Sequence, residues 1–466
     1  MLRFVRLLIF GVFAWECSSC SENGFDEIQK AEGPNFIIII TDDQRYDALG
    51  VVQQELGDGR FPWFETPNLD ALANRGVRFR NAFVVNSLCS PSRASILTGN
   101  YPHMSGNIDN NRPFEDESFV SRLQEAGYHT AHFGKWHMGA QVERPGFDHA
   151  YSFVGQGKYV DAVFYENGEP TETSGWVDNV STDYVLDYIA DYTAENPFCF
   201  LLGYKTPHGP WNHLPQNPEL DNFSNQYIRS TPNLFIKPSY RDEYLTKETY
   251  NFDHGWKDKR ALTYLTEIDR NIGKLVRGLE KNEMLDNTVI IFMSDNGFYF
   301  GEHGLRDKRS AYEESMRIPL IIAGPQVPEG VVSNELVLNI DVAPTVASMT
   351  NTTTEAMQGK DLTKLFGSEN IRTQSGTLNA AWRKSFFYSY HQELIGPPVD
   401  IYAVRTHDHK LIKYKGRPDW TELFDLRGDP FETKNVFDDA SYQEVREELL
   451  REFDRLSNEV QLTSTD

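Results

Sequence analysis

A run of apolar residues from Asn35 to Ile40 is the feature that most constrains how this chain can fold. After the asparagine it consists of one phenylalanine and four successive isoleucines. Such a continuous and largely β-branched run is typical of a strand that is buried on both faces of a parallel sheet. A second run of the same kind spans Val289 to Met293. We therefore expect an α/β fold that is organised around buried parallel strands.

Side chains with oxygen ligands follow both of these runs. Asp42 and Asp43 come shortly after the first run, and Asp295 and Asn296 come shortly after the second. Open α/β sheets bind ligands at the carboxyl ends of their strands, and carboxylate and amide oxygens suit Ca²⁺ or Mg²⁺. On the residues alone, a turn or a helix cap remains an alternative explanation for the two adjacent aspartates.

The segment from Cys89 to Gly99 begins like a helix, with small polar residues and a proline, and it ends at glycine after an apolar run. Cys89 and Arg93 are four positions apart and would share one face of that helix. A potential nucleophile and a fixed cation would then lie near a helix N-terminus, where anions are favoured. A buried thiol next to a surface arginine is the alternative that this segment alone leaves open.

Cys89 to Gly99 resembles the signature of the formylglycine-dependent (type I) sulfatases of the alkaline phosphatase superfamily, Cys-x-Pro-Ser-Arg-x-x-x-Leu-Thr-Gly, and matches each of its fixed positions. Gly127 to Gly139 is similar to the second signature of that family, Gly-Tyr-x-Thr-x-x-x-Gly-Lys-Trp-His-x-Gly. The resemblance extends from about Asn35 to about Val436, and its overall pattern looks most like the N-acetylglucosamine-6-sulfatase-like polysaccharide sulfatases.

The resemblance implies an α/β fold in which a large mixed, mostly parallel sheet is sandwiched by helices. It also implies a sulfuric ester hydrolase in which a formylglycine-generating enzyme oxidises Cys89, and in which the hydrated aldehyde attacks sulfur. The residues that it places in catalysis are Cys89, Arg93, Lys135, His137, His208 and Lys308. Those that it assigns to one bound Ca²⁺ ion are Asp42, Asp43, Cys89, Asp295 and Asn296.

The residue pattern changes near residue 375, which indicates a smaller C-terminal subdomain. Three short segments there alternate as antiparallel strands do, and an amphipathic helix follows them. We therefore expect an α+β unit in which an antiparallel sheet carries one helix. The expected strands span residues 386–390, 402–406 and 410–414, and the helix spans residues 442–459. The predicted domains are a catalytic domain over residues 34–374 and this subdomain over residues 375–466.

For the substrate, the resemblance implies a sulfated polysaccharide or oligosaccharide, either algal, such as ulvan, or a glycosaminoglycan. One alternative is a formylglycine-dependent phosphonate or phosphate ester hydrolase, which shares the fold. Another is a non-catalytic glycan-binding protein, which would be expected to have lost part of the motifs, and no site residue is missing. Candidate sugar contacts are His303, His391, Arg405 and His407.

Residues 1–20 resemble an export signal, because Arg3 and Arg6 precede an apolar core that is too short to span a bilayer. The segment ends in Ser-Ser-Cys, which is similar to a lipoprotein cleavage site and would make Cys20 a lipid anchor, with residues 21–33 as a linker. We thus expect an exported protein without a transmembrane segment, either periplasmic or a cell-surface, outer-membrane lipoprotein. A formal net charge of −23 disfavours nucleic-acid binding.

Overall fold

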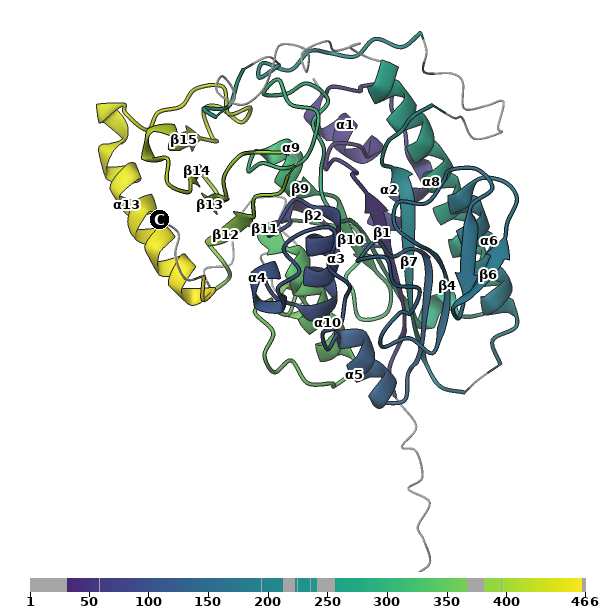
Figure 1. Cartoon of the computed structure of the whole chain (residues 1–466). Helices are drawn as coiled ribbons and strands as arrows, with labels where there is room; N and C mark the ends of the chain where they lie inside the picture. The colour runs from purple at the N-terminus through teal and green to yellow at the C-terminus, as the bar shows by residue number, and fades with distance from the viewer. Residues whose placement is uncertain are drawn as a thin grey trace, which may run out of the picture.

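The computed structural model describes residues 32–57, 59–193, 195–212, 223, 225–234, 236–240, 256–366, 381–394 and 396–462. An eleven-stranded sheet lies at the centre of the molecule (Figure 1). In order across the sheet, the strands are β11 (Val331–Leu338), β2 (Gly76–Phe83), β10 (Leu320–Ala323), β8 (Thr288–Ser294), β1 (Asn35–Asp42), β7 (Phe198–Pro207), β3 (His129–Lys135), β4 (His149–Phe153), β5 (Val163–Glu166) and β6 (Glu169–Glu172), and β9 (Arg317–Ile318) pairs with β2.

Five neighbouring strands, β8, β1, β7, β3 and β4, run parallel to one another. β10 runs antiparallel between β8 and β2, so the sheet is mixed but mostly parallel, as predicted. The isoleucine run forms β1, in which every residue is buried. Ile38 lies opposite Ile291 of β8 on one side and Leu201 of β7 on the other. A strand that is paired at both edges and covered on both faces contacts no water, which explains why its sequence is apolar throughout.

Helices cover both faces of this sheet (Figure 1). Successive side chains of β1 point to opposite faces, so that Ile37 and Ile39 enter one apolar cluster and Ile38 and Ile40 enter another. The helices packed on the first cluster are α1 (Gly50–Leu56), α2 (Pro67–Asn74), α6 (Val177–Ala190) and α8 (Trp256–Lys281). Those on the second are α3 (Cys89–Thr98), α5 (Phe119–Glu125), α10 (Val342–Met349) and α11 (Thr363–Phe366). Short helices in connecting segments are α4 (Pro102–Ser105) and α9 (Glu313–Met316).

The C-terminal part is an antiparallel sheet with a helix packed on it, as predicted, and the sheet has a fourth strand beyond the three that were expected. The elements are β12 (Ser385–Tyr390), β13 (Ile401–Thr406), β14 (His409–Tyr414), β15 (Glu422–Asp425) and α13 (Gln443–Glu459). The ring of Phe453 in α13 lies 5.3 Å from that of Phe387 in β12, and the ring of Phe386 lies 4.9 Å from that of Phe83 in β2. One apolar cluster therefore joins the two sheets. The predicted boundary near residue 375 lies outside the described residues.

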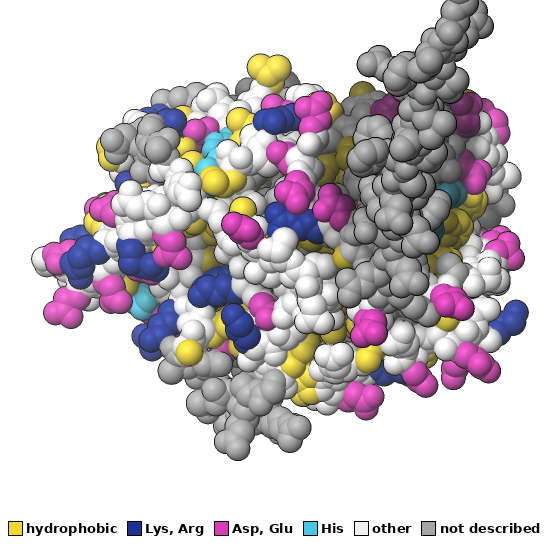
Figure 2. All heavy atoms as spheres, turned by 90° about the horizontal axis from the view of Figure 1, so that it is seen from below, with side chains coloured by type: hydrophobic (Ala, Val, Ile, Leu, Met, Phe, Trp, Pro, Cys, Tyr) yellow, Lys and Arg dark blue, Asp and Glu magenta, His cyan; other side chains and the backbone are white. Residues whose placement is uncertain are grey.

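Charged side chains are spread over the surface. Figure 2 shows one face, on which acidic and basic side chains are interspersed and hydrophobic ones form small groups. Three cations of the predicted site, Arg93, Lys135 and Lys308, are instead only 2%, 0% and 4% exposed. Within the described ranges, none of the helices combines the length and the apolar character that a bilayer span needs. The predicted export signal and Cys20 lie outside these ranges.

Candidate active site

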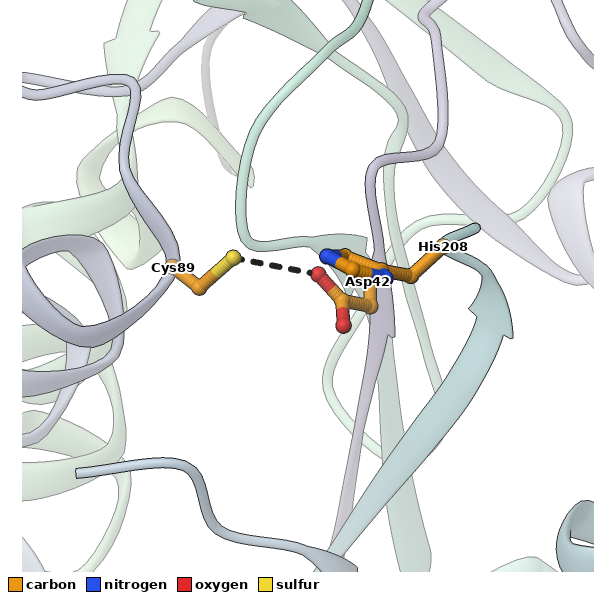
Figure 3. Close-up of side chains that lie close together, drawn as sticks. All are labelled: Asp42, Cys89 and His208. Atoms are coloured by element: carbon orange, nitrogen blue, oxygen red, sulfur yellow. Dashed lines mark hydrogen bonds between the residues drawn. The ribbon is translucent and has the colours of Figure 1, made fainter. Parts of the chain in front are cut away.

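The carboxyl ends of four central strands meet at one edge of the large sheet. β1 ends at Asp42 and β3 ends at Lys135, while Asp295 follows β8 and His208 follows β7. Because these strands are parallel neighbours, side chains that are far apart in the sequence gather at this edge. The N-terminus of α3 faces the same place. Figure 3 shows the Cys89 side chain pointing toward Asp42, with His208 beside it.

Cys89 is the first residue of α3 and is fully buried. Its Sγ lies 3.3 Å from Oδ1 of Asp42 and 3.1 Å from Nζ of Lys308. Burial raises the pKa of the Cys89 thiol to about 12, although the Lys308 ammonium opposes this shift. The sulfur is therefore a neutral thiol that donates to the Asp42 carboxylate. The helix ends where the sequence predicts, because Gly99 adopts a left-handed conformation with φ of 70°.

Each of the three carboxylates at this edge is paired with one buried cation. The ion pairs are Asp42 with Lys135, Asp43 with Lys308 at 2.6 Å, and Asp295 with Arg93 at 2.9 Å. Burying a charge is costly unless a partner of opposite sign accompanies it. The one-to-one pairing explains how six charged groups can share an enclosed site. It also brings three positively charged hydrogen-bond donors into the cluster, of which Lys308 contacts the Cys89 sulfur.

The polar residues at the ends of β1 and β8 form one cluster. The backbone N–H of Asp43 donates to Oδ1 of Asp295 at 3.1 Å, and Nδ2 of Asn296 donates to Oδ1 of Asp43 at 2.6 Å. The potential ligand atoms of Asp42, Asp43, Cys89 and Asp295 all lie within 4.8 Å of one another.

Two oxygens of this cluster lack a donor. Oδ2 of Asp43 and Oδ1 of Asn296 are buried, and no hydrogen-bond partner reaches either atom among the described residues. Buried acceptors of this kind are normally satisfied, and an unsatisfied one costs about 1–3 kcal/mol. A divalent cation with oxygen ligands would satisfy both atoms. The donor set therefore fits the calcium ion that the resemblance to the sulfatases implies at these residues.

Two histidines predicted to act in catalysis border the cluster. Nε2 of His208 lies 3.8 Å from Oδ2 of Asp43, and Nδ1 contacts the Gly209 carbonyl oxygen at 2.5 Å. His137 follows β3 with a positive φ of 54° and is 7% exposed. Burial, reinforced by the nearby Lys135, lowers the pKa of both imidazoles well below the usual range. Both rings are therefore neutral at neutral pH.

Sequence reasoning missed one residue that contacts this cluster. Oε1 of Gln156 accepts from Nζ of Lys135 at 2.5 Å, and Nε2 of Gln156 lies 3.0 Å from Nε2 of His137. Gln156 stands between two glycines, a pattern that indicates only a loop, so no local signal could have identified it. The buried Lys205 is near enough to the cluster for the charge of Asp43 to act on its ammonium group, whose pKa burial lowers to about 8.

The predicted sugar contacts occupy other surroundings. His303 is 1% exposed and stacks on Tyr312 with ring centroids 3.8 Å apart. Arg405 is 5% exposed and its Nε lies 3.3 Å from Oε1 of Glu313. His391 and His407 are half-buried. None of the hydrogen bonds or ion pairs found among the described residues links these four to the Cys89 cluster, and their contacts with sugar stay predictions.

Comparisons with known proteins show the family to which the chain is related. A family model described as Sulfatase matches residues 34–352, and one described as N-sulphoglucosamine sulphohydrolase, C-terminal, matches residues 301–459. An N-acetylglucosamine-6-O-sulfatase of Bacteroides thetaiotaomicron is 31% identical over 95% of this chain and 89% of its own length. An ulvan-active sulfatase of Formosa agariphila is 28% identical over 89% of this chain and 79% of its own.

The fold agrees as well. A solved structure of a protein in complex with its substrate, D-glucosamine-2-N,6-O-disulfate, superposes with a TM-score of 0.80 at 30% identity. The match covers 92% of this chain and 98% of that one. A family match over more than half of the chain, together with a full-length relative above 30% identity, establishes the relationship. With its motifs gathered around Cys89, this chain therefore belongs to the sulfatase family and is a sulfuric ester hydrolase.

Proposed function

We propose that the chain hydrolyses sulfate esters of a sulfated polysaccharide or oligosaccharide, with Cys89 matured to formylglycine and with one bound Ca²⁺. The observation that carries this proposal is the position of Cys89 Sγ, 3.3 Å from Asp42 Oδ1 and 3.1 Å from Lys308 Nζ. An atom at that position touches both the carboxylate cluster and a cation that can hold an anionic group. The substrate class follows from the sulfated sugar bound to the structural relative and from the names of the curated relatives.

The chemistry of the carboxylate cluster supports formylglycine rather than a working thiol. Ca²⁺ prefers hard oxygen ligands, and a thiol sulfur is a soft ligand that suits other metals. Oxidation of Cys89 to an aldehyde, followed by hydration, would replace Sγ by oxygen among Asp42, Asp43, Asp295 and Asn296. When bound there, the metal would supply positive charge that polarises a sulfate oxygen and favours an oxygen nucleophile.

The paired cations are suited to bind the sulfate group. Arg93, Lys135 and Lys308 each present N–H donors within the buried cluster, and Nη2 of Arg93 is buried without a partner among the described residues. Donors that are already fixed in a water-poor site stabilise developing negative charge without reorganising. We assign these three residues to the sulfate oxygens. This would offset the charge that accumulates as the ester bond breaks.

Proton transfers fall to the two neutral histidines. His208 is partly open to solvent, with 21% of its side chain exposed, and it follows the strand next to the one that ends at Asp42. We propose that His208 contacts the leaving oxygen and that, protonated once the anionic sulfate group is bound beside it, it donates the proton with which this oxygen departs as the alcohol. His137, at the end of the next strand, would hydrogen-bond the nucleophile and assist breakdown of the sulfated enzyme.

An aromatic pair beside His208 suits a sugar substrate. Trp211 and Phe298 meet with ring centroids 5.8 Å apart, and both are half-buried. Trp211 is anchored by a hydrogen bond from Nε1 to the Pro207 carbonyl oxygen at 2.7 Å, and Phe298 follows Asn296 by two residues. Ligand pockets combine such apolar surfaces with a few placed polar groups. We propose that this pair borders the sugar-binding part of the pocket.

The remaining features of the proposal concern location and maturation. We propose a catalytic domain over residues 34–374 and a C-terminal subdomain over residues 375–466. Export through residues 1–20, with Cys20 as a lipid anchor, would place the enzyme in the periplasm or at the cell surface, where sulfated glycans are met. Maturation requires a formylglycine-generating enzyme as a partner.

The test is a desulfation screen of protein coexpressed with a formylglycine-generating enzyme. Mass spectrometry of the Cys89 peptide first establishes conversion of the thiol to the aldehyde. Released sulfate is then measured with a panel of sulfated mono- and oligosaccharides, and a phosphonate monoester is assayed in parallel. We expect turnover of at least one sulfated sugar. Faster turnover of the phosphonate monoester would instead favour the phosphonate hydrolase, and tight binding of sulfated sugars without turnover would favour a glycan-binding protein.

A further inference from the structure

Gln156 lies in the loop after β4, a fifth strand whose end continues the row of strand ends in the active site. β4 is the parallel neighbour of β3, and Phe153 at the end of β4 lies opposite Lys135 at the end of β3. The loop that follows β4 therefore begins beside the residues that β3 delivers to the site. Gln156 is the third residue of that loop, and it is half-buried. Its backbone position, not only its side chain, makes it part of the site.

The amide of Gln156 bridges two residues of the site. Oε1 accepts from Nζ of Lys135 at 2.5 Å, and Nε2 lies 3.0 Å from Nε2 of His137. Burial lowers the pKa of Lys135 well below its usual range, but its ion pair with the Asp42 carboxylate holds it as an ammonium group. An ammonium group can only donate, so the atom that faces it must be the amide oxygen. The amide NH₂ group must then be the atom that faces His137. The orientation of the amide is thus fixed by its charged partner.

This orientation determines which nitrogen of His137 carries the proton. The NH₂ group of Gln156 is a donor, so Nε2 of His137 has to be the unprotonated acceptor. The neutral ring then carries its proton on Nδ1. Nδ1 of His137 is buried and has no hydrogen-bond partner among the described residues. The ring therefore keeps one free N–H donor, and that donor is on the side away from Gln156.

The glycines around Gln156 explain how the loop holds it there. Gly155 and Gly157 have positive φ values of 62° and 61°, a conformation that costs other residues about 1–2 kcal/mol. A Cβ atom on Gly157 would also lie 2.5 Å from the Phe153 ring. The loop can therefore turn sharply within two residues of β4, and it returns the Gln156 side chain to the end of β3.

We propose that Gln156 is a positioning residue, which holds His137 in the tautomer with its proton on Nδ1 and fixes the distance between His137 and Lys135. It acts through these two residues. The effect on catalysis rests on the proposed function, because it requires that His137 and Lys135 act on the sulfated group. The effect on the tautomer does not, because it depends only on the hydrogen bonds in the folded chain.

The Gln156→Glu variant tests the tautomer directly. A carboxylate accepts but does not donate, so it would attract the proton to Nε2 of His137 and leave Nδ1 as the acceptor. The ¹⁵N chemical shifts of ¹⁵N-histidine-labelled protein distinguish the two tautomers, and the His137 signal is identified by its loss in His137→Asn. We expect the ¹⁵N chemical shifts of Nδ1 and Nε2 of His137 to exchange in Gln156→Glu. The matched control is Gln443→Glu, the same change at an exposed position of α13, which should leave the His137 signal in place.

Kinetics with matured enzyme then test the catalytic consequence. We expect Gln156→Glu and the nearly isosteric Gln156→Met to lower kcat about tenfold to a hundredfold with little change in KM, as removal of a supporting residue commonly does, and Gln443→Glu to change neither. The inference is overturned if the His137 pattern is unchanged in Gln156→Glu, or if kcat of both variants stays within twofold of wild type. An inactive wild-type enzyme would contradict the proposed function, and the tautomer measurement would still decide the role of Gln156. Gln156→Met keeps the test open if Gln156→Glu does not fold.

Discussion

Removal of calcium should weaken the binding of sulfate, because the metal and the anion depend on the same charged pairs. In the structure, Arg93, Lys135 and Lys308 are each bonded to one carboxylate of the proposed calcium site. A bound calcium ion would draw on those carboxylates and release the three cations to bind an anion. Without calcium, sulfate has to compete with the carboxylates for every cation that it contacts. The two ligands should therefore bind with positive coupling.

The size of this coupling follows from the bonds that sulfate would otherwise have to break. A hydrogen bond between charged groups contributes about 1.5–3 kcal/mol. If calcium relieves one of the three cation–carboxylate bonds, the coupling free energy is of that order, which corresponds to a change of about tenfold to a hundredfold in the dissociation constant. Linkage requires that sulfate strengthens calcium binding by the same factor.

Isothermal titration calorimetry with inorganic sulfate measures the effect. Protein is titrated in millimolar calcium and again in excess chelator, at constant ionic strength, with chloride as the control anion. We expect the Kd for sulfate to rise about tenfold to a hundredfold on chelation, and the Kd for calcium to fall by the same factor in saturating sulfate. Equal affinities for sulfate under the two conditions would refute the argument that the cation–carboxylate pairs link the two sites.

Three further predictions concern Cys89 and the buried ion pairs. Cys89→Ala cannot be oxidised to an aldehyde, so sulfate release should drop to background while the Tm stays close to that of wild type; residual multiple turnover would contradict the formylglycine proposal. Arg383→Met leaves the buried Asp341 carboxylate without its two 2.7 Å hydrogen bonds from the guanidinium group. The free energy of unfolding in urea should therefore fall by about 3–5 kcal/mol, and a fall of less than about 1 kcal/mol would contradict a stabilising role for this ion pair. Burial opposes ionisation of Glu313, but Arg405 and Lys410 outweigh it and hold the pKa of its carboxyl well below its usual range. That stabilisation is complete above the unfolded pKa of about 4.3 and is lost as the pH falls toward the pKa of the folded state. The difference in the free energy of unfolding between wild type and Glu313→Gln should therefore narrow from pH 7 to pH 3.

The central sheet could be predicted from the sequence because its strands are buried on both faces. The isoleucine run of β1 is typical of a strand that is buried on both faces, and β8 has the same character. β5, β6 and β15 were not predicted, since they are short and lie toward the edges of their sheets, where polar residues such as those of Glu169–Glu172 are tolerated.

Most of the cluster around Cys89 could be predicted because its residues lie in motifs that resemble those of the sulfatases. Asp42, Lys135 and Asp295 also end or follow strands, and Cys89 begins a helix. Gln156 could not, because its role depends on the pairing of β4 with β3, which is a property of the sheet and not of the local sequence. The one-to-one pairing of cations with carboxylates was also beyond prediction. Sequence order gives no indication that Lys308 lies next to Asp43, 265 positions away.

The net charge of the chain and the buried cations of its site act differently on an anionic ligand. With a formal net charge of −23, the surface does not attract a polyanion over long distances. Arg93, Lys135 and Lys308 are buried, where salt screens them little and where each is balanced by a carboxylate. We therefore expect an anion to bind only when it reaches the edge of the sheet and when the carboxylates have another partner. The surface field opposes every anionic ligand alike. Discrimination between one anionic ligand and another should therefore depend on the enclosed geometry at Cys89.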